Sequence, residues 1–98
     1  MTGTTRTSAD LDPRRRRTLY RSWHRGTREM DLLMGRFADA EIGTLSEADL
    51  ADFELLIEVP DRDLFRWLST DDPAPENYDT PVFRRLKAFH QHGAPIHV

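Results

Sequence analysis

A helical stripe near the middle of the chain is the feature that most limits its fold. Five apolar residues recur there at intervals of three and four positions, which is the spacing of one face of an α-helix: Met30, Leu33, Met34, Phe37 and Ala38. Such a stripe must be buried, so this helix needs partners. Gly35 lies inside the same segment. Because glycine within a helix costs about 1 kcal/mol relative to alanine, we expect Gly35 to mark a close contact between helices.

A shorter helix is expected before this stripe, over residues 13–24. Pro13 suits the first helical position, and Asp12 before it is a suitable N-cap. The apolar edge of this helix consists of Leu19, Tyr20 and Trp23. Residues 1–12 are mostly small, polar or charged, and we expect them to form a disordered tail.

A glycine among charged residues separates the two helices. Gly26 permits a positive φ angle, and Thr27 after it is expected to cap the helix that carries the stripe. Glu29 falls in the first turn of that helix, where the helix dipole favours an anion. The dense charge here comes from Arg25, Arg28, Glu29 and Asp31. This cluster is therefore either the ordinary chemistry of a helix start or a contact site for another protein.

Three more helices are expected after Gly43, which ends the second helix. Ser46 is a suitable N-cap for the third, which ends near residue 58, and Asp61 is expected to cap a short fourth helix over residues 63–68. Pro81 opens a fifth helix that Gly93 closes. The sequence predicts an all-α fold, a small five-helix bundle in one domain over residues 13–93, with a short tail at 94–98.

Composition excludes several classes of site and partner. The chain has 98 residues and no cysteine, so disulfides, thiolate metal sites and thiol nucleophiles are excluded. A chain this small buries only about 60–65% of its unfolded surface, which leaves little room for an enclosed active site. Residues 1–28 carry eight arginines and two aspartates, whereas residues 29–98 carry six basic and fifteen acidic residues. A basic front on an acidic body favours an oriented partner surface over a general nucleic-acid binder.

No residues with the pattern of a catalytic or metal site stand out. Ser22 and His24 are two positions apart, so they point away from each other on a helix. Three histidines occur near the end of the chain, at positions 90, 92 and 97. Since His90 and His92 do not share a helix face and His97 lies in the expected tail, we predict no metal site. No apolar run approaches the length of about 20 residues that a membrane span needs.

Two motifs resemble those of a known family. Arg25-Gly26-x-x-Glu29-x-Asp31 resembles the RGxxExD motif of the succinate dehydrogenase assembly factor 2 family, whose bacterial members are called FAD assembly factors. Asp61-x-Asp63-Leu64-Phe65-x-Trp67-Leu68 is similar to the family's DxDLFxWL signature. Both motifs occur in the family's order, and the resemblance covers residues 19–89.

The resemblance implies a non-enzymatic helper protein. It implies binding to the flavoprotein subunit of succinate dehydrogenase, and in bacteria also to fumarate reductase. There the protein would promote covalent attachment of FAD to a histidine of that subunit. The FAD would belong to the partner, with no cofactor stably bound by this chain. The implied docking residues are Arg25, Gly26, Glu29 and Asp31, and Arg28 joins them as part of the same cluster. Asp61 and Asp63 are implied to cap and support this surface.

The resemblance also sets expectations for the free protein. We expect a monomer without nucleic-acid binding or membrane insertion, in the cytoplasm of a bacterium or the mitochondrial matrix of a eukaryote. Two alternatives stay open. One is a small helical regulator or antitoxin-like protein with another partner, and the other is a nucleic-acid binder that uses Arg14–Arg17.

Overall fold

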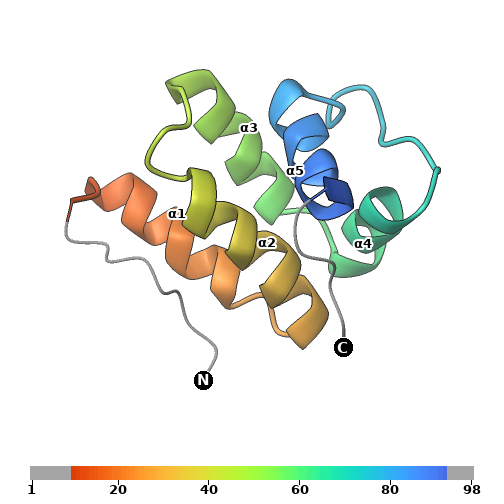
Figure 1. Ribbon diagram of the computed structural model, residues 1–98, viewed down its shortest axis with the longest axis horizontal. Helices are drawn as coiled ribbons and strands as arrows, with labels where there is room; N and C mark the ends of the chain where they lie inside the picture. The colour runs from red at the N-terminus through yellow and green to blue at the C-terminus, as the bar shows by residue number, and fades with distance from the viewer. Residues whose placement is uncertain (1–9, 93–98) are drawn as a thin grey trace. The chain divides into compact units, whose positions relative to one another are not determined.

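The computed structural model describes residues 10–92, and this part of the chain contains five α-helices and no β-strand (Figure 1). The helices are α1 (Pro13–Trp23), α2 (Arg28–Glu41), α3 (Glu47–Ile57), α4 (Asp61–Ser69) and α5 (Pro81–His92). The predicted all-α class and the five helices are confirmed. Residues 1–9 and 93–98, including the expected end at Gly93 and the tail after it, lie outside the described residues. No helix within 10–92 is long and apolar enough to cross a bilayer.

The described helices fall into two compact units. Residues 10–45 form the first unit, with α1 and α2, and residues 46–92 form the second unit, with α3, α4 and α5. A single domain over 13–93 stays a prediction.

In the first unit, α1 and α2 pack side by side and run in opposite directions (Figure 1). The indole of Trp23 lies on the backbone of Gly35, where an added Cβ atom would come within 2.7 Å of the Trp23 Cε3 atom. The Trp23 Nε1 atom also donates a hydrogen bond to Asp39 at 3.2 Å. The predicted close contact at Gly35 is therefore confirmed. All five residues of the predicted stripe are buried: Met30, Leu33, Met34, Phe37 and Ala38.

The helix starts of the first unit use the predicted caps. A carboxylate oxygen of Asp12 accepts a hydrogen bond from the Arg15 amide at 2.8 Å, and the Thr27 hydroxyl accepts one from the Met30 amide at 3.3 Å. Two expectations were wrong. Leu11, assigned to the tail, is buried, because this residue already packs within the first unit. Tyr20, assigned to the apolar edge, is 63% exposed, since it lies about 100° around the helix from Leu19.

In the second unit, α5 packs against both α3 and α4. The Ser46 hydroxyl caps α3 by accepting a hydrogen bond from the Asp49 amide at 3.0 Å, as predicted. The expected cap at Asp61 was wrong. The Pro60 carbonyl accepts hydrogen bonds from the amides of Asp63 and Leu64, so α4 begins at Asp61 and Pro60 takes the N-cap position. The Asp61 carboxylate thus lies in the first turn instead, near the positive end of the helix dipole.

Candidate functional site

The connection between α1 and α2, residues 24–27, has the backbone shape that its glycine predicts. Gly26 has a φ angle of +111°, a region that residues with a side chain rarely adopt. Apart from Gly26 and its two neighbours in the chain, no residue has a heavy atom within 4 Å of the position that a Cβ atom would occupy there. Glycine is therefore required by backbone conformation and not by crowding, and the space outside the turn is open.

Asp31 fixes this connection from the side of α2. One of its carboxylate oxygens accepts a hydrogen bond from the Arg25 amide at 2.6 Å, while the Asp31 amide donates to the Thr27 carbonyl at 2.9 Å. The acid thus reaches back over the turn that precedes its own helix. Sequence reasoning missed this role. An acidic residue one turn after a glycine-containing connection could have indicated it, by analogy with a capping box.

The structure brings the predicted docking residues together at one short turn and the start of α2. We call these residues the loop cluster: Arg25, Gly26, Arg28, Glu29 and Asp31. Arg28 is exposed and Glu29 is half-buried. Within residues 10–92, these two side chains form no ion pair or hydrogen bond with another side chain. The turn therefore presents charges of both signs on a fixed backbone, and a role for them in binding stays a prediction.

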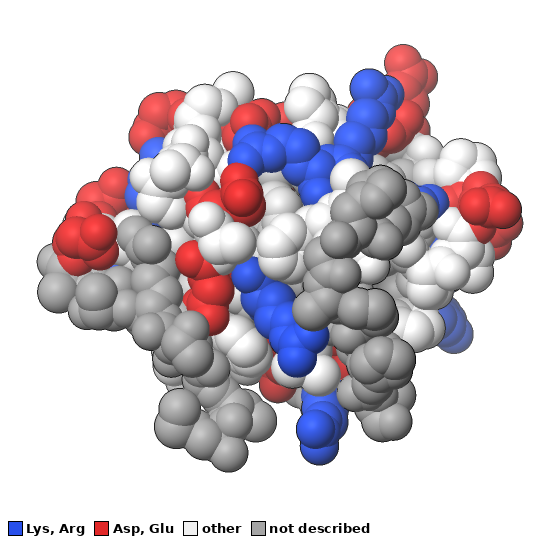
Figure 2. Space-filling model, viewed as in Figure 1, with Lys and Arg blue, Asp and Glu red and all other residues white. Residues whose placement is uncertain are grey.

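Charge on the molecular surface is mixed. On the face that Figure 2 draws, acidic and basic side chains lie close together, with uncharged surface between them. A surface of this kind suits a specific partner with matching charges more than general binding to a polyanion.

The two acidic residues of the second motif have local roles in the second unit. Asp61 and Asp63 both lie in the first turn of α4. Asp63 pairs with Arg66 at 3.8 Å, and Arg66 also pairs with Asp72 at 3.5 Å, which ties α4 to the segment that follows it. Their predicted support of the docking surface stays a prediction.

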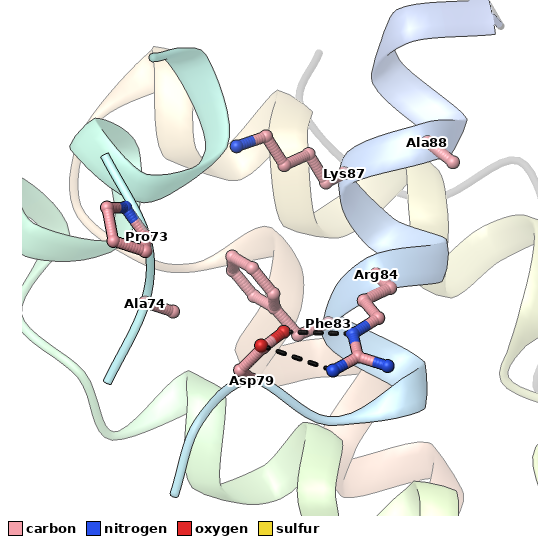
Figure 3. Close-up of a pocket in the computed structure, with 7 residues that line it drawn as sticks. All are labelled: Pro73, Ala74, Asp79, Phe83, Arg84, Lys87 and Ala88. Carbon is pink, nitrogen blue, oxygen red and sulfur yellow. Dashed lines mark hydrogen bonds and ion pairs between the residues drawn. The ribbon is translucent and has the colours of Figure 1, made fainter. Parts of the chain in front are cut away.

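A pocket of about 270 Å³ lies in the second unit, where α5 faces the segment after α4 (Figure 3). Its lining residues are Pro73, Ala74, Asp79, Phe83, Arg84, Lys87 and Ala88. The Arg84 guanidinium donates to both carboxylate oxygens of Asp79, at 3.0 and 3.2 Å, and the Lys87 ammonium donates to the Thr70 carbonyl at 2.8 Å. Through its hydrogen bonds, Arg84 lowers the pKa of Asp79 below the usual value. Arg84 and Lys87 therefore hold the segment between α4 and α5 in place.

Other candidates for chemistry are accounted for by structural contacts. Ser22 is fully buried, and its hydroxyl donates to the Thr18 carbonyl at 2.8 Å. The His24 Nδ1 atom lies 2.7 Å from the Tyr20 carbonyl oxygen, so Ser22 and His24 have separate partners. In the part of the chain that the structure describes, no three potential metal ligands gather. The side chain of His92 and all of His97 lie outside that part.

Comparisons with known proteins agree with the two motifs. The family model described as "Flavinator of succinate dehydrogenase" matches residues 16–90, which include the loop cluster. The FAD assembly factor SdhE of Acetobacter pasteurianus is 43% identical over 77 residues, which cover 79% of this chain and 71% of that protein. The mitochondrial succinate dehydrogenase assembly factor 2 of Dictyostelium discoideum is 38% identical over 79 residues, which cover 81% of this chain and 56% of that one.

A third relative has a similar degree of sequence identity. The mitochondrial succinate dehydrogenase assembly factor 2 of Danio rerio is 38% identical over 81 residues, which cover 81% of this chain and 51% of that protein. The chain thus spans between half and three quarters of the length of these relatives.

Proposed function

Because the chain belongs to the family of flavinators of succinate dehydrogenase, we propose that it assists the covalent attachment of FAD to the flavoprotein subunit of that enzyme. The observation that carries the proposal is the family match over residues 16–90. The matched range holds both motifs and the turn at Gly26, whose positive φ angle the sequence motif predicts.

In this proposal the loop cluster is the docking site. Its backbone is held by the Asp31 carboxylate and the Thr27 cap, so the site needs little ordering when the partner binds. The open space beside Gly26 lets the partner's backbone approach closely. Arg28 and Glu29 then provide charges for complementary groups on the partner.

The helper acts by positioning and not as a catalyst. Flavinylation joins the partner's own histidine to the partner's own FAD, so both reacting groups lie outside this chain. A protein that holds the flavoprotein subunit in one arrangement can bring these groups close to the geometry of reaction. The buried Ser22 and the internally paired cations of the pocket support a role without catalytic residues in this chain.

The finer features of this role follow the same proposal. FAD stays with the partner, the free protein is a monomer, and fumarate reductase is a second partner in bacteria. One relative is from a bacterium, and the name of another includes the word mitochondrial. We place this protein where the flavoprotein subunit is assembled, in the bacterial cytoplasm or the mitochondrial matrix. A regulator or antitoxin-like protein with another partner is not favoured, since the family match covers most of the chain.

The test is reconstitution with purified components. The apo flavoprotein subunit is incubated with FAD, with and without this protein, and then denatured and separated by electrophoresis. Covalent flavin fluorescence of the subunit is expected to rise when the protein is present, and the two proteins should elute together in gel filtration. Absence of both a complex and a rise in fluorescence would overturn the proposal.

A further inference from the structure

The outward face of α1 has an unusual composition. The helix contains five arginines and no acidic residue. Its inward face buries Thr18, Leu19, Ser22 and Trp23. Four exposed residues lie on its outward face, separated by one, three and four positions. We call them the α1 stripe: Arg16, Arg17, Tyr20 and His24. The stripe ends at the residue next to Arg25, so it is continuous with the loop cluster.

The centre of the α1 stripe is a fixed aromatic pair. The rings of Tyr20 and His24 are stacked, with centroids 3.8 Å apart and an interplanar angle of 14°. The contact of His24 Nδ1 with the Tyr20 carbonyl holds the imidazole in place. Tyr20 is nevertheless 63% exposed. An aromatic side chain that is already ordered loses little conformational entropy on binding, which is why tyrosine is common at interface centres.

Neighbouring arginines of α1 have different surroundings. Arg15 has a structural role, because it pairs with Asp12 at 3.3 Å and donates to the Ile42 carbonyl at 2.7 Å, at the far end of α2. Arg16 and Arg17, in contrast, point to the exposed side beside Tyr20. The run of four arginines is therefore not one uniform basic patch. Its two stripe members flank an aromatic group, as in a protein interface.

We propose that the α1 stripe is a second part of the docking surface and binds an acidic patch on the flavoprotein subunit. In this arrangement Tyr20 enters an apolar depression of the partner, and Arg16 and Arg17 pair with carboxylates around it. The inference rests on the proposed function and adds to it a contact outside the RGxxExD motif. Charge complementarity favours an acidic surface on the partner, since the stripe is positive and contains no carboxylate.

A nucleic acid fits the same stripe less well. The whole chain has a net charge of −3. Domains that bind a phosphate backbone are usually basic overall, which this chain is not, whereas a protein partner can present a bounded acidic patch. The stripe also offers only two exposed arginines, while tight phosphate binding uses many contacts.

The test measures affinity of the full chain for the flavoprotein subunit by titration calorimetry, at about 50 mM and about 500 mM salt. The variants are Tyr20→Ala, Arg16→Glu and Arg17→Glu. The matched control is Arg62→Glu, which makes the same charge change at an exposed arginine of α4. Circular dichroism spectra and melting curves verify that each variant folds.

We expect Tyr20→Ala to weaken binding by about thirtyfold at both salt concentrations, because it removes a central aromatic contact. Each arginine reversal should weaken binding by about tenfold at low salt and by much less at high salt, because salt screens exposed charges. Arg62→Glu should bind as the wild type does. Wild-type affinity from folded stripe variants would overturn the inference and leave the proposed function intact.

Two other results separate the remaining cases. If the wild type itself does not bind the flavoprotein subunit, the proposed function fails, and this inference fails with it. A duplex DNA probe at low salt tests the other occupant. If the wild type binds DNA and the stripe variants lose only DNA binding, the stripe is a nucleic-acid site and the inference is overturned.

Discussion

The segment between α1 and α2 and the segment between α4 and α5 both join helices and both carry charged residues. In the longer segment, residues 70–80, the charges hold the chain: Asp79 pairs with Arg84, and Asp72 pairs with Arg66. In the shorter segment, residues 24–27, the backbone is held by the Asp31 carboxylate and the Thr27 hydroxyl. The charges of Arg28 and Glu29 beside it remain on the surface.

This difference separates charges that hold a connection in place from charges that are available to a partner. Where the charged residues of a segment form ion pairs with the helices on either side, a structural role accounts for their charge. Where short side-chain contacts to backbone amides fix the turn, the nearby charges are not needed to hold it and can serve a partner. Arg28 and Glu29 of the loop cluster belong to the second kind, and the charged residues of the pocket in Figure 3 belong to the first.

The largest expected effect comes from the contact between Gly35 of α2 and the Trp23 ring of α1. Gly35→Leu would force a side chain into the space that the Trp23 ring occupies. Overpacking of a core by single methylenes already costs about 1–3 kcal/mol, so we expect this variant to lose the helical signal of the first unit. Circular dichroism measures the loss. Gly43→Leu, at an exposed glycine after α2, should remain folded, and equal stability of both variants would contradict the packing role of Gly35.

Gly26→Val tests the backbone of the turn. Because the φ angle is +111° and the space outside is open, valine introduces strain without a clash. Such strain costs about 1–3 kcal/mol, and the added side chain should also block approach of the partner. Urea unfolding and binding are measured on the same samples. If binding falls only as far as the folded fraction does, Gly26 has a structural role alone.

Asp31→Ala tests how the turn is held. The substitution leaves the partly buried Arg25 amide without its acceptor, which typically costs about 1–3 kcal/mol. We expect faster amide hydrogen exchange at residues 25–27 and weaker partner binding. Asp31→Asn retains an acceptor oxygen and should restore most of the stability. If both variants are as stable as the wild type, the turn is held by other contacts.

The smallest effect is expected in the longer segment. Asp79→Asn removes the carboxylate of an exposed ion pair with Arg84, so binding of the flavoprotein subunit should not change. Its stability effect depends on pH in a known direction. Because the pKa of Asp79 is lowered in the folded protein, its contribution is present above the unfolded value of about 3.9 and disappears as pH falls through the folded pKa. Unfolding midpoints of wild type and variant should therefore converge in acid, and divergence there would contradict the pairing.

The sequence predicted local helix signals better than contacts between distant residues. Asp12, Thr27 and Ser46 were identified as caps because a capping side chain bonds to an amide three residues later. The need for close packing at Gly35 was also predicted, but not that Trp23 fills the space. The reason is that the approach of two helices depends on side-chain shapes that periodicity does not contain.

The misassigned residues have similar causes. Asp61 was expected to cap a helix over residues 63–68, but Pro60 is the N-cap and the helix begins at Asp61. Tyr20 was assigned to the apolar edge of the first helix with Leu19 and Trp23, although its position on the helix points it outward. The bond from the Arg25 amide to Asp31 spans six residues across a turn and follows from the conformation of Gly26, not from spacing alone.

The most direct test of the docking role compares two acidic residues in first turns of helices, Glu29 of α2 and Glu47 of α3. Each change to alanine should cost about 0.3–1 kcal/mol of stability through the helix dipole. For Glu29, loss of an interface charge should also cost about 2–5 kcal/mol of binding, which lowers affinity by about thirtyfold to several thousandfold.

The measurement is covalent flavin fluorescence of the denatured flavoprotein subunit, with the helper protein at limiting concentration. We predict that the wild type and Glu47→Ala raise flavinylation equally, while Glu29→Ala, though folded, produces little increase. Equal flavinylation by all three proteins would contradict the account and return Glu29 to the role of an ordinary acid at a helix start.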